Sequence, residues 1–365
     1  MKVLLLGASG NVGRRAALEL INEPDVHEVV LAGRNEEDLE RLAGTSAKAS
    51  VMIVDLEREI PFGIERFDVV CNCAGPAYLF EVTSVDASIE AGVHYVSVCD
   101  DGWIADEIWE RDEAAKSAEV TVVSGCGLSP GLTNFLVAHA ERELGTIDEA
   151  LISVAVSSAD APGDASALHL LAALSKPAEY FSDGIADSDP GGSRPRLVYF
   201  PEPVGWVETF HSDHPEIRTL TRARPGLQTV SFRIGLSERA AMDAMRLSVL
   251  LGAGHSVATR RAWLQLVKPF RGILEQLPPR VAPWSAARVD VWGSSGKGRS
   301  NVSYAVVDHL ANLAGVPVAR AAVALARGSA PPGVQPPEAA FDRLQLLREL
   351  VRTGIRIAKL EPQEV

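Results

Sequence analysis

The feature that most constrains the fold is a glycine-rich turn near the start of the chain. The apolar run Val3–Leu6 stops at Gly7, and a helical pattern begins at Arg14. Between them the chain has glycines at 7, 10 and 13, with Ala8 where the usual Gly-x-Gly-x-x-Gly motif has its first glycine. A buried strand, a glycine turn and a helix N-terminus form a seat for phosphate, because unpaired N–H groups and the helix dipole point the same way. The pattern predicts a dinucleotide-binding unit.

Length and charge limit the remaining possibilities. The 365 residues exceed one typical domain of roughly 100 to 200 residues, so we expect two domains. A net charge of −13 leaves no basic stripe for nucleic acid or anionic lipid, and neither is expected as a partner. No apolar run approaches the roughly 20 residues of a membrane span, and the four cysteines lack Cys-x-x-Cys spacing. We expect a cytoplasmic protein with reduced thiols.

Strand-like runs alternate with helical stretches through the first third of the chain. The runs after Val3–Leu6 are Glu28–Gly33, Ala49–Val54, Phe67–Cys73, His94–Cys99 and Val120–Ser124. This alternation predicts a Rossmann-type, doubly wound parallel sheet, whose ligands bind at the carboxyl ends of the strands. The candidate cofactor residues follow those ends, and they are Gly7, Ala8, Ser9, Gly10, Asn11, Val12, Arg34, Asn35, Asp55, Ala74, Gly75 and Pro76.

Arg34 bears on which dinucleotide is bound. It follows the second strand, about twenty residues after the glycine turn, where NAD-binding proteins usually carry an acidic residue for the ribose hydroxyl. An arginine there suits a 2′-phosphate, so NADP is expected and NAD is the less favoured alternative. Arg34 as a surface residue paired with Glu36 or Glu37 is the competing interpretation. The carboxylate of Asp55 is expected to reach the adenine amino group.

A second domain follows with a different pattern. Its strand-like runs alternate between apolar and polar residues, and they are Leu151–Ser157, Leu197–Phe200, Thr229–Ile234, Arg288–Trp292 and Asn301–Val307. Such runs, joined by glycine or proline turns, predict that the second domain is α+β and built on a mostly antiparallel sheet. Together with the doubly wound first domain, the chain is expected to belong to the α/β class. We expect an NADP-binding domain over 1–134 and a substrate-binding and dimerisation domain over 135–315. The half-exposed sheet favours a homodimer.

Several motifs together resemble one enzyme family. The motifs are Gly7–Gly13, Cys73–Pro76, Trp109–Ala115, Gly127–Asn134, Phe200–Gly205 with His214–Glu216, and Gly333–Glu338. The chain resembles the saccharopine dehydrogenase-like oxidoreductases, which include lysine 6-dehydrogenase and carboxynorspermidine synthase. The resemblance implies hydride transfer at the C–N bond of a small amine, imine or amino acid. It also implies that the chain's end, over about residues 316–365, packs back on the nucleotide domain. Residues 354–359 are the candidate for a strand that returns there.

The resemblance suggests one proton-transfer residue, and this chain lacks a second residue that saccharopine reductases have. Asp112 matches by position an aspartate proposed to act in saccharopine reductases, although neighbouring glutamates also fit a solvated acidic helix face. The reductases' cysteine after the first strand of the second domain has no counterpart, because Ser157 and Ser158 occupy that neighbourhood.

A histidine loop supplies the other candidates. His211 and His214 could act as acid or base, since an imidazole has an unperturbed pKa near about 6.5. Their spacing and Pro215 do not fit a metal site, and no metal is expected. A substrate carboxylate requires a guanidinium, and four arginines follow the histidines: Arg218, Arg222, Arg224 and Arg233. The substrate candidates carried forward are Tyr95, Asp101, Arg222 and Arg224.

Two other functions compete with amine or imine chemistry. An enoyl reductase would need an apolar channel and no carboxylate anchor. A sensor or scaffold would bind NADP without turning it over, and the missing cysteine keeps that alternative open.

Overall fold

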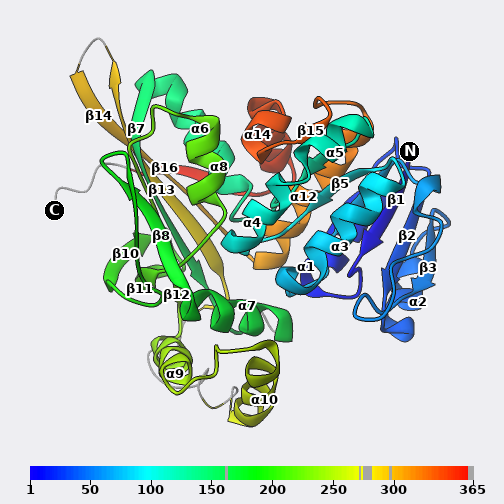
Figure 1. Ribbon diagram of the computed structural model, residues 1–365, viewed down its shortest axis with the longest axis horizontal. Helices are drawn as coiled ribbons and strands as arrows, with labels where there is room; N and C mark the ends of the chain where they lie inside the picture. Colours follow the sequence, from blue (N-terminus) through cyan, green and yellow to red (C-terminus); the bar gives the residue numbers. More distant parts are fainter. Residues whose placement is uncertain (161–162, 271–272, 274–281, 296–297, 361–365) are drawn as a thin grey trace. The chain divides into compact units, whose positions relative to one another are not determined.

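The computed structural model describes residues 1–160, 163–270, 273, 282–295 and 298–360. The chain divides into two compact units, each built from separate stretches of sequence (Figure 1). The first unit comprises Met1–Phe135 and Ala311–Thr353, and the second comprises Leu136–Leu310 and Gly354–Val365. None of the helices among the described residues is long and apolar enough to cross a membrane.

The first unit contains a parallel sheet of seven strands in the order β15-β6-β5-β4-β1-β2-β3. The strands are β1 (Lys2–Leu6), β2 (Glu28–Gly33), β3 (Ala49–Ile53), β4 (Val69–Asn72), β5 (His94–Ser97), β6 (Thr121–Val123) and β15 (Gly333–Val334). The prediction of a doubly wound parallel sheet is confirmed. Strand order reverses between β1 and β4, and such a switch point is where these sheets bind ligands.

Helices cover both faces of this sheet, so its inner strands are continuously apolar. The helices with residues in the unit are α1 (Asn11–Asn22), α2 (Glu36–Ala43), η1 (Ile64–Arg66), α3 (Ala77–Glu90), α4 (Gly102–Trp109), α5 (Asp112–Ser117), α6 (Leu132–Leu144), α12 (Leu310–Ala326), α13 (Pro337–Ala340) and α14 (Arg343–Arg352). Leu4, Val30, Val70 and Val122 of neighbouring strands lie in one buried core cluster. All four cysteines are free thiols, as expected.

Helix α12 returns late in the chain and packs against α1. A Cβ atom on Gly315 would lie only 2.7 Å from the carbonyl oxygen of Val12, so the two helices approach closely at this glycine. Further along α12, Arg320 donates to Glu19 at 2.6 Å and to Glu23 at 2.7 Å. The close approach and the paired charges make the late segment part of the first unit.

The second unit is built on a nine-stranded sheet. Its main path runs β10-β11-β12-β7-β13-β14-β16, and β8 pairs with both β12 and β9. The strands are β7 (Thr146–Val156), β8 (Pro177–Ser182), β9 (Ile185–Pro190), β10 (Arg196–Phe200), β11 (Gly205–His211), β12 (Thr229–Leu236), β13 (Ser285–Ser295), β14 (Gly298–Asp308) and β16 (Arg356–Leu360). The pair β12 and β7 is parallel, whereas the other pairs are antiparallel, so a mostly antiparallel sheet is confirmed.

Among the residues that the structure describes, five helical segments lie entirely in the second unit. They are α7 (Asp164–Ser175), α8 (Glu216–Ala223), α9 (Arg239–Leu250), α10 (Val257–Val267) and η2 (Lys268–Phe270). Their place in the sequence, between strands of one sheet, agrees with the expected α+β organisation.

The expectation that residues 354–359 return to the nucleotide sheet is wrong. Strand β16 pairs with β14 in the second sheet, where Ala358 lies opposite Ala305. Exposed Arg356 and Lys359 suit an edge strand, whereas a strand inside the first sheet needs two apolar faces. The amine of Lys359 also pairs with Glu143, within the second unit. Residues 361–365 of the expected return segment lie outside the described residues.

The close approach of α12 to α1 predicts that Gly315→Ala destabilises the protein. Alanine gains about 1 kcal/mol of helix propensity, but overpacking against backbone atoms costs about 1–3 kcal/mol. We expect the free energy of unfolding, measured by urea denaturation, to fall. Ala324→Gly, a partly exposed position in the same helix, is the control for propensity alone. A more stable Gly315→Ala variant would contradict the packing.

Candidate functional site

The glycine turn after β1 lies against the loop after β4. Gly7 has a φ of +70°, and a Cβ atom there would lie 2.6 Å from the backbone nitrogen of Ala74. A Cβ atom on Gly13 would lie 2.1 Å from the carbonyl oxygen of Gly7. The N–H of Gly10 donates to the same carbonyl at 3.0 Å. Side chains are therefore excluded at positions 7 and 13, and the turn sits directly at the switch point between β1 and β4.

The N-terminus of α1 is open toward an anion. Gly10 is its N-cap residue and supplies no side-chain hydrogen bond, and the first turn holds no acidic residue. Helix α2 differs, because Asn35 caps it by accepting from the N–H of Asp38 and its first turn carries three acids. The first N–H groups of an uncapped helix have no intrahelical partner and carry a partial positive charge. The glycine cradle and the open helix end therefore fit a dinucleotide pyrophosphate.

Arg14 braces the turn, and the sequence analysis missed it. Its Nε donates to the carbonyl oxygen of Ser9 at 2.8 Å, and its Nη2 lies 2.7 Å from the carboxylate of Asp38. The second contact ties the turn to α2. An arginine directly after the glycine motif was the only signal in the sequence.

Arg34 and Asp55 follow the neighbouring strands β2 and β3. The side chain of Arg34 is 69% exposed and lies 3.7 Å from Glu57. The carboxylate of Asp55 accepts from the N–H of Glu57 at 3.2 Å and lies 3.4 Å from Arg58. An exposed ion pair of this length contributes little, so Arg34 can exchange Glu57 for another anion. The side chain of Asn35 is engaged in capping α2, and its cofactor role stays a prediction.

A buried carboxylate lies beneath this edge of the sheet. Glu81 of α3 accepts hydrogen bonds from the hydroxyl groups of Tyr95 at 2.8 Å, Ser97 at 2.5 Å and Ser124 at 2.7 Å. These hydroxyls come from β5 and from the end of β6. Burial raises the pKa of Glu81, and the three hydroxyl donors oppose that shift by stabilising the charged form.

The network continues to the cofactor loop through Asn72. The amide of Asn72 donates to the Tyr95 hydroxyl at 2.8 Å, and its oxygen accepts from the N–H of Ala74 at 2.8 Å. Ala74 is the residue that the glycine turn contacts. The chain of bonds from Glu81 through Tyr95 and Asn72 therefore fixes the loop 74–76 from below, and nothing in the sequence signalled it.

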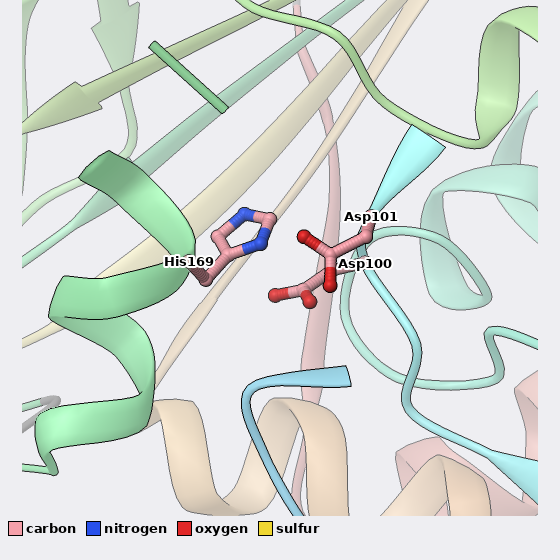
Figure 2. A group of neighbouring side chains, drawn as sticks. All are labelled: Asp100, Asp101 and His169. Carbon is pink, nitrogen blue, oxygen red and sulfur yellow. The ribbon is translucent and has the colours of Figure 1, made fainter. Parts of the chain in front are cut away.

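This network corrects the substrate role predicted for Tyr95. The side chain of Tyr95 is fully buried in the middle of the sheet, and burial raises its pKa well above the usual range. Asp101, another substrate candidate, is also buried, and it accepts from the N–H of Tyr78 in the first turn of α3 at 2.7 Å. Figure 2 shows Asp100 and Asp101 just before α4. These hydrogen bonds of Tyr95 and Asp101 are all made to other residues of the first unit, and they stabilise its fold.

Asp112 has a structural position rather than the expected catalytic one. One oxygen of its carboxylate accepts from the N–H of Val334 in β15 at 2.9 Å, and the other lies 2.7 Å from Lys116. Gly333 and Thr121, the first residues of β15 and β6, are paired beside it. Asp112 therefore sits toward the amino ends of these strands, whereas parallel sheets bind ligands at the carboxyl ends. Its contacts hold β15 at the sheet edge.

In the second unit, His214 forms a buried pair with Glu216. The imidazole Nδ1 is hydrogen-bonded to the Glu216 carboxylate, and the ring stacks on Phe232 at 3.7 Å between centroids. Both members of the pair are buried. His169 of α7, drawn in Figure 2, meets the His214 ring edge-on at 6.3 Å. A carboxylate that accepts from Nδ1–H leaves Nε2 as the basic nitrogen.

His211 lies on the other face of the same sheet. It pairs in register with Arg233, while His214 stacks on Phe232, and consecutive residues of a strand point to opposite faces. Its Nδ1 lies 3.0 Å from Asp189. Burial and the Arg233 guanidinium lower the pKa of His211, against the opposing effect of Asp189. The two predicted histidines therefore do not form one site.

The arginines predicted to bind substrate lie at the end of α8. Arg224 donates to Glu141 at 2.6 Å, and its charge already has this partner within the second unit. Arg222 is exposed. Arg218, the nearest alternative, pairs with Asp213 at 2.7 Å and with Glu179 at 2.9 Å. The structure therefore gives Arg224 and Arg218 partners inside the protein, and their binding of substrate remains a prediction.

Comparison with known proteins agrees with the geometry of the first unit. Residues 3–123 match the family model described as the saccharopine dehydrogenase NADP binding domain. The similarity to this family covers about the first third of the chain. No protein with a curated description matches it.

A solved structure shares the fold of this chain. Apo saccharopine dehydrogenase (L-Glu forming) from Saccharomyces cerevisiae is 17% identical, with a TM-score of 0.67 over 99% of this chain and 100% of that chain. Amine dehydrogenase from Mycobacterium smegmatis is 12% identical, with a TM-score of 0.48 over 93% of this chain and 95% of that chain. At such identities, the first likeness concerns the fold alone.

Two of the motifs behind the family resemblance meet inside the first unit. Asn134, at the end of the Gly127–Asn134 motif, donates to Glu338 at 2.9 Å and accepts from the N–H of Gly131 at 3.0 Å. Glu338 ends the motif Gly333–Glu338 and is buried. Motifs separated by some two hundred residues in this chain are thus parts of one hydrogen-bonded structure.

The buried network predicts the effect of removing the Tyr95 hydroxyl. Tyr95→Phe leaves Glu81 and the amide of Asn72 each short of a partner, which costs about 1–3 kcal/mol of unfolding free energy. We expect NADPH affinity to fall as well, because Asn72 orients the loop at Ala74. Chemical denaturation and fluorescence titration measure the two effects. Tyr199→Phe, at a partly buried position of β10, is the control, and equal behaviour of both variants would contradict the network.

Proposed function

We propose that this chain is an NADP-dependent oxidoreductase that transfers hydride at the C–N bond of a small amine, imine or amino acid. The observation that carries the proposal is the glycine turn. Gly7 and Gly13 exclude side chains, and the N-terminus of α1 has neither a side-chain cap nor an acid in its first turn. The family model matched by residues 3–123 supports the same cofactor.

The first unit would hold the cofactor through residues from three loops. Backbone N–H groups in the first turn of α1 would bind the pyrophosphate, and Arg34 would pair with the 2′-phosphate. Ala74–Pro76, fixed by Asn72, would offer a small-residue surface to the cofactor. Bound NADP would supply the acceptor or donor of hydride.

His214 is the proposed proton carrier. The carbon bonded to an ammonium nitrogen cannot release hydride until that nitrogen has lost a proton, because the freed lone pair forms the C=N bond. A positioned base accelerates such proton transfers. Glu216 holds Nδ1 of His214 by a hydrogen bond and so leaves Nε2 to accept the proton. The stack on Phe232 fixes the ring plane. Asp112 is not retained in this role, because its carboxylate binds the N–H of Val334 and pairs with Lys116.

One observation favours a second candidate, an NADP-binding protein without turnover. The resemblance to saccharopine reductases implies a cysteine in the neighbourhood of Ser157 and Ser158, and this chain has none there. The hydroxyl of Ser157 donates to the buried carboxylate of Glu238 at 2.6 Å, so it is engaged in the fold. Spectrophotometric NADPH oxidation and NADP reduction with amines, amino acids and 2-oxo acids separates the two candidates. Binding without turnover of any substrate would favour the second.

Arg34 is predicted to set cofactor preference. A charge-assisted contact contributes about 1.5–3 kcal/mol, or about ten- to a hundredfold in affinity. Arg34→Asp should weaken NADPH binding by that factor and improve NADH binding, as measured by titration of each. Arg66→Asp makes the same charge change on an exposed residue of the same unit and should leave the ratio unaltered. An unchanged preference in Arg34→Asp would rule out the 2′-phosphate contact.

The His214 pair predicts a clear kinetic effect. His214→Asn should lower kcat about 10²- to 10⁴-fold with little change in NADPH affinity, the usual effect of losing a general base. Glu216→Gln should lower kcat less, because it disturbs only the orientation of the ring. Asp112→Asn is the comparison and should keep nearly full activity. Full activity in His214→Asn, or a comparable loss in Asp112→Asn, would contradict His214 as the base. Asp112 would then again be the candidate.

A further inference from the structure

Arg233 is a buried cation that the proposed reaction does not use. It lies in the middle of β12 and is 7% exposed. One end of its guanidinium donates to the carbonyl oxygen of Arg194. Its Nε is buried and has no hydrogen-bond partner among the described residues. A buried donor without a partner lowers the free energy of unfolding by about 1–3 kcal/mol. The position of this nitrogen therefore does not stabilise the fold.

The surroundings of Arg233 are positively charged. Burial and the charges of Arg196 and Arg194 lower its pKa to about 10, with Asp189 opposing them. Asp189 is itself shared, because its carboxylate lies 2.7 Å from Arg194 and 3.0 Å from His211. Asp187 also interacts with Arg194. Two carboxylates therefore face three guanidinium groups, those of Arg233, Arg194 and Arg196, and the cluster has excess positive charge.

A second buried polar atom lies on the adjoining segment. The hydroxyl oxygen of Ser193 is buried without a partner among the described residues. The carbonyl oxygen of Ser193 accepts from the N–H of His211, the residue paired with Arg233 across the strands. Arg194 and Arg196, which follow Ser193, are exposed. The cluster therefore has a buried floor at Arg233 and a rim of guanidinium groups open to solvent.

We propose that Arg233, Ser193, Arg194 and Arg196 form a binding site for a small oxyanion, the phosphoryl or carboxylate group of a metabolite. Guanidinium groups bind such oxygens through paired N–H donors. A bound oxyanion would accept a hydrogen bond from the buried Nε of Arg233, which has no partner among the described residues. The site belongs to the second unit, whereas the glycine turn belongs to the first. It also lies on the face of β12 opposite the one on which His214 stacks, so it is separate from the proposed proton carrier.

The test is titration of the full chain, at constant ionic strength, with orthophosphate, pyrophosphate and glutarate, followed by calorimetry and thermal unfolding. We expect at least one of these anions to bind and to raise the unfolding temperature, as a ligand specific for the native state does. Preference for the phosphates or for glutarate identifies the chemical source of the anion.

Variants locate the binding. Arg233→Gln should weaken it about ten- to a hundredfold, the effect of one charge-assisted contact. Arg196→Gln, at an exposed position that does not threaten folding, should weaken it about two- to fivefold, as expected for an exposed pair. Arg299→Gln is the control, because it removes another exposed charge, one that pairs with Asp148 and Glu149.

Either of two results would overturn the proposal. One is the absence of binding by all three anions, and the other is an equal loss of binding in Arg299→Gln and Arg196→Gln. NADPH titration of the same samples reports separately on the first unit. Failure of this site therefore leaves the proposed cofactor site untouched, and the reverse also holds.

Discussion

The close contact between two backbone segments is the constraint on which the first unit depends. Gly7 and Ala74 follow β1 and β4, the strands between which the sheet order reverses, and their backbones approach so closely that no side chain fits at position 7. The same turn packs Gly13 onto the carbonyl of Gly7. Because the glycines remove side chains here, main-chain N–H groups can approach a phosphate directly. The helix dipole then adds a favourable field without any charged side chain.

A rigid support below is needed for such a contact to hold its geometry. Glu81 provides it, since one carboxylate gathers hydroxyls from two neighbouring strands, and Tyr95 and Asn72 carry the connection to the loop at Ala74. A buried carboxylate is costly unless its lone pairs are satisfied, and here three hydroxyl donors satisfy them. The site for the cofactor is thus made of a main-chain surface and a buried polar network, and only the surface has a recognisable motif.

The main-chain surface has a sequence motif and the buried network has none, and this difference explains which features could be predicted from the sequence. Apolar runs such as Glu28–Gly33 match their strands closely, because a parallel strand buried on both faces has a strong local signal. Contacts between distant residues have no such signal. Asp112 looked catalytic by position, yet its partner is Val334, more than two hundred residues later. Tyr95 looked available to substrate, yet its hydroxyl points into a network that forms only when three strands and a helix are assembled. His211 and His214 are close in sequence, but β-strand alternation separates them onto opposite faces.

The interleaving of the two units has a consequence for how the protein is made. The sheet of the first unit is completed by β15, and α1 is covered by α12, so both wait for residues that the ribosome adds after almost the whole second unit. Domains usually fold in order from the N-terminus during synthesis. Here the nascent nucleotide-binding segment must remain incomplete, with one strand edge and one helix face uncovered, until residues 311–353 emerge. Completion of the nucleotide-binding unit is therefore a late event in the synthesis of the chain.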